Sequence, residues 1–210
     1  PGFLPQGPRF AGQTARTASA RVLSDQDRAK RFATLYLEDL ADLVQATVSP
    51  HFSLSRYSEH IARAASSFET IIDAVAVPPT MTDRFMLESL WEHLERLNPS
   101  LVCLTVPFPG NLYGSFRMAS SIKNQRPDIT IALGGGYANT ELRRLSDPRV
   151  FDYVDYVTLD DGERPLLSLI EHLAGARPRT GLCRTFYRDK DRVVFANDTS
   201  DRDFSMDEVG

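Results

Sequence analysis

Residues 101–106 read Leu-Val-Cys-Leu-Thr-Val, an unbroken apolar run of the length that a buried strand needs. Two similar runs follow, Ile-Thr-Ile-Ala-Leu at 129–133 and a third at 154–159. Helix-like segments separate them, over 112–125 and, after a glycine triplet, a short helix capped by Asn139. Another helix is expected over 164–174. Strands that alternate with helices predict an α/β fold, with a parallel sheet of the Rossmann or flavodoxin-like kind and flanking helices.

The segments on either side of this core have different patterns. Beyond Pro178, the runs 182–188 and 193–196 predict a C-terminal β-hairpin, and the acidic tail 197–210 is typical of a linker. Before Pro99, apolar residues recur every three or four positions and predict helices over about 24–43, 57–75 and 85–97, after a loop over 1–21. We therefore expect a helical N-terminal portion over 1–98, an α/β core over 99–176, and a hairpin with a linker over 177–210.

Composition narrows the function classes. The chain has 210 residues and a formal net charge of −4, without the basic stripe that a nucleic-acid surface needs. No apolar run approaches the ~18 residues of a membrane span, and no signal peptide opens the chain. The two cysteines, Cys103 and Cys183, stand in strand-like runs and are predicted to be buried, reduced thiols. These features favour a cytoplasmic protein that binds neither nucleic acid nor a membrane.

Ligands of an open parallel sheet bind beyond the carboxyl ends of its strands. Three loops follow predicted strands here, and they supply the candidate cofactor-binding residues: Thr105, Pro107, Gly110, Asn111, Gly134, Gly135, Gly136, Tyr137, Asp160, Gly162 and Glu163. Glycine permits close approach of backbone to a ligand. Each loop also has a purely structural interpretation: the glycines turn the chain, the acidic residues form a solvated turn, and Glu163 stabilises a helix N-terminus.

Catalytic and metal-ligating constellations are not found in the sequence. The glycines have neither the spacing G-x-G-x-x-G nor a following Gly-Lys-Ser/Thr, and no serine stands in a G-x-S-x-G elbow. His51, His60, His93 and His172 are dispersed, without a cysteine partner at metal-binding spacing. We predict no catalytic residue and no metal ligand in this chain.

The core resembles the cobalamin-binding-type domain found ahead of many radical S-adenosylmethionine domains. The resemblance rests on Pro-Ser-Leu-Val-Cys-Leu-Thr at 99–105, Ile-Ala-Leu-Gly-Gly-Gly at 131–136, Val-Asp-Tyr-Val at 154–157 and the turn Asp-Asp-Gly-Glu at 160–163. In that family the second strand ends in a glycine pair against which the corrin ring or nucleotide tail lies. The resemblance implies an accessory domain that covers or binds a cofactor or substrate beside a catalytic domain of the same polypeptide.

Three departures limit what the resemblance implies. The motif D-x-H-x-x-G is missing, and its nearest fragment, around His172 and Gly175, has Ile170 where aspartate is required. Any cobalamin would therefore bind without a histidine ligand from this chain. Two cysteines cannot hold an iron–sulfur cluster that needs three thiolates, so the cluster and S-adenosylmethionine are expected only in a radical domain after Gly210. The family's opening strand is also absent, as in a fragment.

Two other functions remain open from the sequence. The chain is equally compatible with a flavodoxin-like scaffold or interaction module that binds no cofactor. A nucleotide-binding half domain is supported only by the glycines after a strand.

Overall fold

The computed structural model describes residues 24–48, 68–205 and 207, and the chain divides into two units, Pro1–Tyr57 and Ser58–Gly210. The loop predicted over 1–21, the first part of the helix predicted over 57–75, His51 and His60 lie outside the described residues.

The first unit contains helix α2 (Asp25–Thr47). Its start is the predicted one: the Ser24 hydroxyl accepts a hydrogen bond from the Asp27 backbone N–H at 3.2 Å, and Asp25 and Asp27 occupy the first turn. None of its residues is buried, and the large apolar side chains Phe32, Tyr36, Leu37, Leu40 and Leu43 are exposed. These apolar residues of α2 are each more than a third exposed to solvent.

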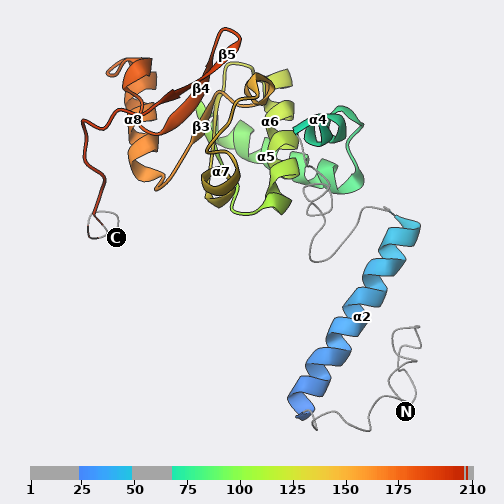
Figure 1. Cartoon of the computed structure of the whole chain (residues 1–210). Helices are drawn as coiled ribbons and strands as arrows, with labels where there is room; N and C mark the ends of the chain where they lie inside the picture. Colours follow the sequence, from blue (N-terminus) through green and yellow to red (C-terminus); the bar gives the residue numbers. More distant parts are fainter. Residues whose placement is uncertain (1–23, 49–67, 206, 208–210) are drawn as a thin grey trace, which may run out of the picture. The chain divides into compact units, whose positions relative to one another are not determined.

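The second unit is built on a five-stranded mixed sheet (Figure 1). Its strands, in spatial and chain order, are β1 (Leu101–Thr105), β2 (Thr130–Gly134), β3 (Tyr156–Thr158), β4 (Thr185–Asp189) and β5 (Arg192–Ala196). β1, β2 and β3 are parallel, with Leu101 beside Thr130 and Ala132 beside Tyr156. β4 runs antiparallel to β3, and β4 and β5 form the predicted hairpin. The predicted α/β class, the three adjacent parallel strands and the hairpin are confirmed.

The helices of this unit are α4 (Phe68–Ala76), α5 (Met81–Leu97), α6 (Leu112–Gln125), α7 (Gly136–Glu141) and α8 (Glu163–Leu173). Short 3₁₀ turns are η1 (Pro109–Asn111), η2 (Pro148–Asp152) and η3 (Arg179–Gly181). α5 starts four residues before the expected position because Thr80 and Asp83 form a capping box. Asn139, predicted as a cap, lies inside α7, whose N-cap is Gly135. None of the helices in the described ranges is long and apolar enough to cross a membrane.

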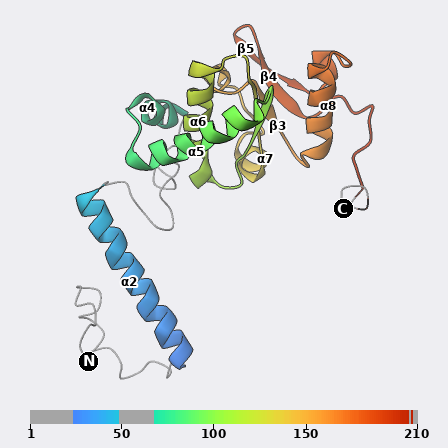
Figure 2. The ribbon, with the colours of Figure 1, turned by 180° about the vertical axis from the view of Figure 1, so that it is seen from behind.

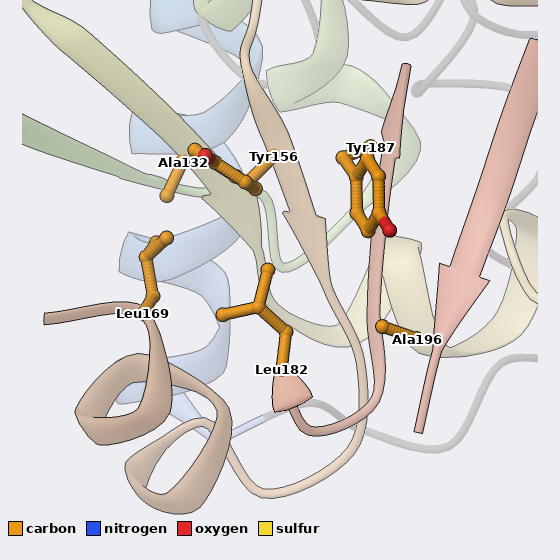
Figure 3. Close-up of a cluster of buried hydrophobic side chains, with 6 residues drawn as sticks. All are labelled: Ala132, Tyr156, Leu169, Leu182, Tyr187 and Ala196. Carbon is orange, nitrogen blue, oxygen red and sulfur yellow. The ribbon is translucent and has the colours of Figure 1, made fainter. Parts of the chain in front are cut away.

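The core has two halves, one on each side of the sheet. Helices α4, α5 and α6 lie on one side and α8 lies on the other (Figures 1 and 2). On the α8 side, Leu169 of α8 packs in a buried cluster with one residue from each of four strands and one from the loop before β4 (Figure 3). These residues are Ala132, Tyr156, Tyr187, Ala196 and Leu182. On the other side, Phe116 and Ile122 of α6 are completely buried. Because successive strand residues point to opposite faces of a sheet, the buried Ile131 and Leu133 of β2 lie on the face opposite to Ala132.

The buried guanidinium of Arg117 joins the three helices on the α6 side. Its nitrogens donate to the Ala74, Val75 and Val77 carbonyl oxygens at 2.8, 2.7 and 3.0 Å, which satisfies the C-terminal carbonyls of α4. Arg117 also donates to the Tyr113 hydroxyl, which in turn donates to Asp83 at 2.8 Å. Burial raises the pKa of Tyr113 to about 12. The network fixes α4, α5 and α6 relative to one another.

One prediction about the core is wrong. Cys183 is buried, but Cys103 is exposed. The reason is its strand: β1 lies at the end of the sheet, and among the described strands only β2 pairs with it. Leu101, two residues earlier on the same face, still packs against the cluster below α8, whereas Cys103 is left uncovered. An apolar run of the buried type therefore forms an edge strand here.

Candidate functional site

The structure brings the three predicted loops together at the carboxyl edge of β1, β2 and β3. The Val106 N–H donates to the Gly134 carbonyl at 2.8 Å, and the Tyr137 N–H donates to the Val106 carbonyl at 2.9 Å. Asn139 links the second loop to the third, since its side-chain oxygen accepts from the Asp160 N–H at 2.5 Å. The edge is thus a continuous surface of three hydrogen-bonded loops.

The glycine triplet is explained by packing between these loops. Gly135 has φ +101°, and a Cβ there would lie 2.8 Å from the Val106 carbonyl oxygen and 2.9 Å from the Val106 nitrogen. A Cβ at Gly136 would lie 2.9 Å from the Pro107 oxygen, and one at Gly134 would lie 2.7 Å from Thr158 Oγ1. Backbone atoms of the first loop therefore already require glycine at positions 135 and 136, whereas a side chain at position 134 would need the Thr158 side chain to shift. A substitution at Gly135 perturbs the fold and cannot report on ligand binding.

Other predicted residues of this edge are open to solvent. Thr105 is exposed at the end of β1, and Pro107 and Asn111 are exposed in the loop after it, where Gly110 is half-buried. Gly162 and Glu163 are exposed after β3, and a Cβ at Gly162 would meet no atom within 4 Å. Tyr137 is half-buried, and burial raises the pKa of its hydroxyl.

Phe108 adds an apolar side chain to this edge and was not among the predicted cofactor-binding residues. Its side chain is 68% exposed, more than any other large apolar residue in the described ranges. It stands between Pro107 and Pro109, directly before η1, in the loop that follows β1. A signal was present in the sequence, because an aromatic residue between two prolines cannot enter the adjoining strand or helix and must lie in the loop.

The acidic turn is paired with two arginines. Asp160 adopts φ +60°, and its carboxylate contacts Arg143 and lies 3.6 Å from Arg184 Nε. Arg184 also binds Asp203 through two nitrogens, at 3.0 and 2.5 Å. This contact holds the pKa of Asp203 below its usual range. The turn is therefore part of a charged network that the sequence pattern did not indicate.

The segment after β5 packs against the α/β unit, whereas a linker was predicted there. Arg177 contacts Asp198 and Asp201 at 3.6 and 2.5 Å, and the Asp198 N–H donates to the Leu182 carbonyl. Arg164 of α8 donates to the Arg202 carbonyl at 2.9 Å and lies 4.5 Å from the ring of Phe204. These contacts come from three separate parts of the chain, so local sequence gave no signal for them.

The two described histidines each contact a backbone carbonyl oxygen through a ring nitrogen. His93 Nδ1 lies 2.7 Å from the Ser89 carbonyl oxygen, and His172 Nδ1 lies 2.9 Å from that of Arg177. In the part of the chain that the structure describes, no three His, Cys, Asp or Glu residues gather as a metal site would require.

A separate depression of about 250 Å³ lies where β2 and β3 begin, at the edge opposite the three loops. It is lined by Thr130, Phe151, Asp155, Tyr156, Arg179 and Arg188. None of these residues was predicted as a site residue. No protein-family model matches the chain, and a search of curated proteins finds no match.

Proposed function

We propose that this chain is an accessory domain of the cobalamin-binding type, acting beside a radical S-adenosylmethionine domain, with a flavodoxin-like sheet. One observation carries the proposal: the segments of the resemblance are β1, β2 and β3, parallel and adjacent in chain order, with their following loops bonded at one edge. That edge is where open α/β sheets bind ligands.

The exposed groups of this edge suit the flank of a large planar ligand. Phe108 offers an apolar wall, and Thr105 and Asn111 offer polar side chains beside it. Gly162 leaves open space after β3. Because the glycine triplet is occupied by protein contacts, these side chains would make the contacts with a cofactor or with a substrate held by the neighbouring domain. Cobalamin would supply an alkyl or electron carrier there, without a histidine from this chain.

The alternative is a scaffold or interaction module that binds no cofactor. The observation in its favour is that Gly135 and Asp160, two of the most ligand-like predicted residues, have complete structural explanations in contacts with Val106, Arg143 and Arg184. Exposed Phe108 would then contact a protein partner.

A titration with hydroxocobalamin, followed by absorbance, separates the two functions. Gly162→Val is the steric probe, because Gly162 has φ −67° and a side chain there meets no protein atom. We expect saturable binding by the wild type and at least tenfold weaker binding by Gly162→Val. Gly114→Ala in α6 is the control, since its Cβ makes only an ordinary contact with Met86, and it should bind like the wild type.

The outcomes are distinct. No binding by the folded wild-type chain would favour the scaffold module. Equal binding by wild type and Gly162→Val would place the cofactor away from the loop after β3.

A further inference from the structure

The depression between the starts of β2 and β3 has an unusual arginine in its wall. The guanidinium of Arg179 lies 4.1 Å from the ring centroid of Tyr187 and 5.5 Å from that of Tyr156. The two tyrosines come from neighbouring strands and belong to the buried cluster in Figure 3. Stacking on aromatic rings fixes the plane of a guanidinium and leaves its N–H groups directed outward around the edge.

Arg179 has unused hydrogen-bonding capacity. Its Nε is buried and has no hydrogen-bond partner in the structure. Among the described residues, no carboxylate forms an ion pair with it. A buried donor without an acceptor is unfavourable, and a charged one more so. The protein thus holds a cation in a fixed plane without supplying its anion.

The other charges around the depression are balanced. Asp155 accepts from Lys123 Nζ at 2.6 Å and from the Ile131 N–H at 2.7 Å. Arg188 donates to Asp152 and to the Pro148 carbonyl. Once these pairs are set aside, the charge that remains in the wall is the positive charge of Arg179.

We infer that this depression binds a small oxyanion, a phosphate or carboxylate group, with Arg179 as its principal ligand. A guanidinium presents parallel N–H donors that match two oxygens of such a group. Thr130 and Arg188, whose side chains carry a hydroxyl and a second guanidinium, line the same space. A volume of about 250 Å³ is below that of most drug-sized pockets, which suits a small anion. The site lies at the opposite edge from the proposed cofactor surface and does not depend on it.

Calorimetric titration of the full chain with inorganic phosphate, and separately with malonate, tests the inference. Sodium chloride at matched ionic strength is the control for general screening. Arg179→Met keeps the aliphatic packing against Tyr187 but removes the charge and the donors. We expect Arg179→Met to raise the apparent Kd by about tenfold or more for whichever anion the wild type binds. Arg192→Met, which changes an exposed arginine of β5 outside the depression, should leave the Kd unchanged.

Arg179→Lys provides a second test if Arg179→Met does not fold, as judged by circular dichroism. Lysine keeps the charge but lacks the planar fork, so it should bind the anion more weakly than the wild type. Binding of phosphate alone or of malonate alone supports the site and identifies the preferred oxyanion. The inference is wrong if the wild type binds neither anion above the chloride control, or if the folded Arg179 variants bind as tightly as the wild type.

Discussion

Replacing Gly135 by alanine should destabilise the α/β unit by about 2–6 kcal/mol. Two costs contribute. The backbone angles φ +101° and ψ −176° belong to a region that is essentially restricted to glycine, and a side chain there costs on the order of 1–3 kcal/mol. The new Cβ would also lie 2.8 Å from the Val106 carbonyl oxygen, a backbone atom that the Tyr137 N–H already binds. Moving that backbone costs roughly 1–3 kcal/mol more.

Urea unfolding followed by far-ultraviolet circular dichroism measures this loss, with two matched glycines as controls. Gly162→Ala, at an open position with negative φ, should stay within about 0.5 kcal/mol of the wild type. Gly114→Ala, inside α6, should gain about 0.5–1 kcal/mol because alanine is the better helix former. A Gly135→Ala protein as stable as the Gly162→Ala protein would refute the packing explanation of the glycine triplet.

Three further outcomes follow from other contacts. Arg117→Met should cost about 3–5 kcal/mol in urea unfolding, because it removes the countercharge of the buried Asp83 carboxylate and leaves three carbonyls without their donor, and a loss below about 1 kcal/mol would contradict that role. A colorimetric thiol reagent should modify Cys103 in the native protein and Cys183 only in urea, whereas a native protein in which Cys103 does not react would show that β1 is covered. Arg184 lowers the pKa of Asp203 in the folded state. Asp203 therefore stabilises the folded protein at pH values above its unfolded pKa of about 3.9, and this stabilisation is lost as the pH falls through the lower folded pKa. Hydrogen-exchange protection of residues 198–203 should therefore fall in acid and be weakened already at neutral pH in Asp203→Asn. Protection that is independent of pH and of this substitution would show that the Arg184–Asp203 pair does not hold this segment.

The sheet was predictable because its signals are local. Each parallel strand is a short apolar run bounded by polar or glycine residues, and the intervening helices have their own period. The start of α5 was also readable, since Thr80 and Asp83 have capping-box spacing. The exposure of Cys103 was not predictable, because the same apolar run forms either an inner or an edge strand, and neighbouring strands decide which.

The gathering of the three loops was predictable from topology, but their chemistry was not. Parallel strands put their carboxyl ends on one edge, and this alone brings Thr105, Gly135 and Asp160 to neighbouring loops. Glycine is required at position 135 because of its positive φ and the nearby Val106 backbone, and neither can be inferred from the sequence. Arg143 and Arg184 reach Asp160 from sites 17 and 24 residues away along the chain, a pairing set by tertiary structure.

The two edges of the sheet therefore differ in what they leave available to a ligand. At the carboxyl edge, arginine–aspartate pairs balance the charge of Arg184, although its Nε has no hydrogen-bond partner, and the exposed groups are an aromatic ring, short polar side chains and the Glu163 carboxylate. Such a surface favours contact with a large, weakly charged partner through shape and apolar area. At the opposite edge, Arg179 keeps a buried donor and an unbalanced charge, which favours a small anion through directed hydrogen bonds. Because no residue lines both places, loss of recognition at one edge does not require loss of recognition at the other.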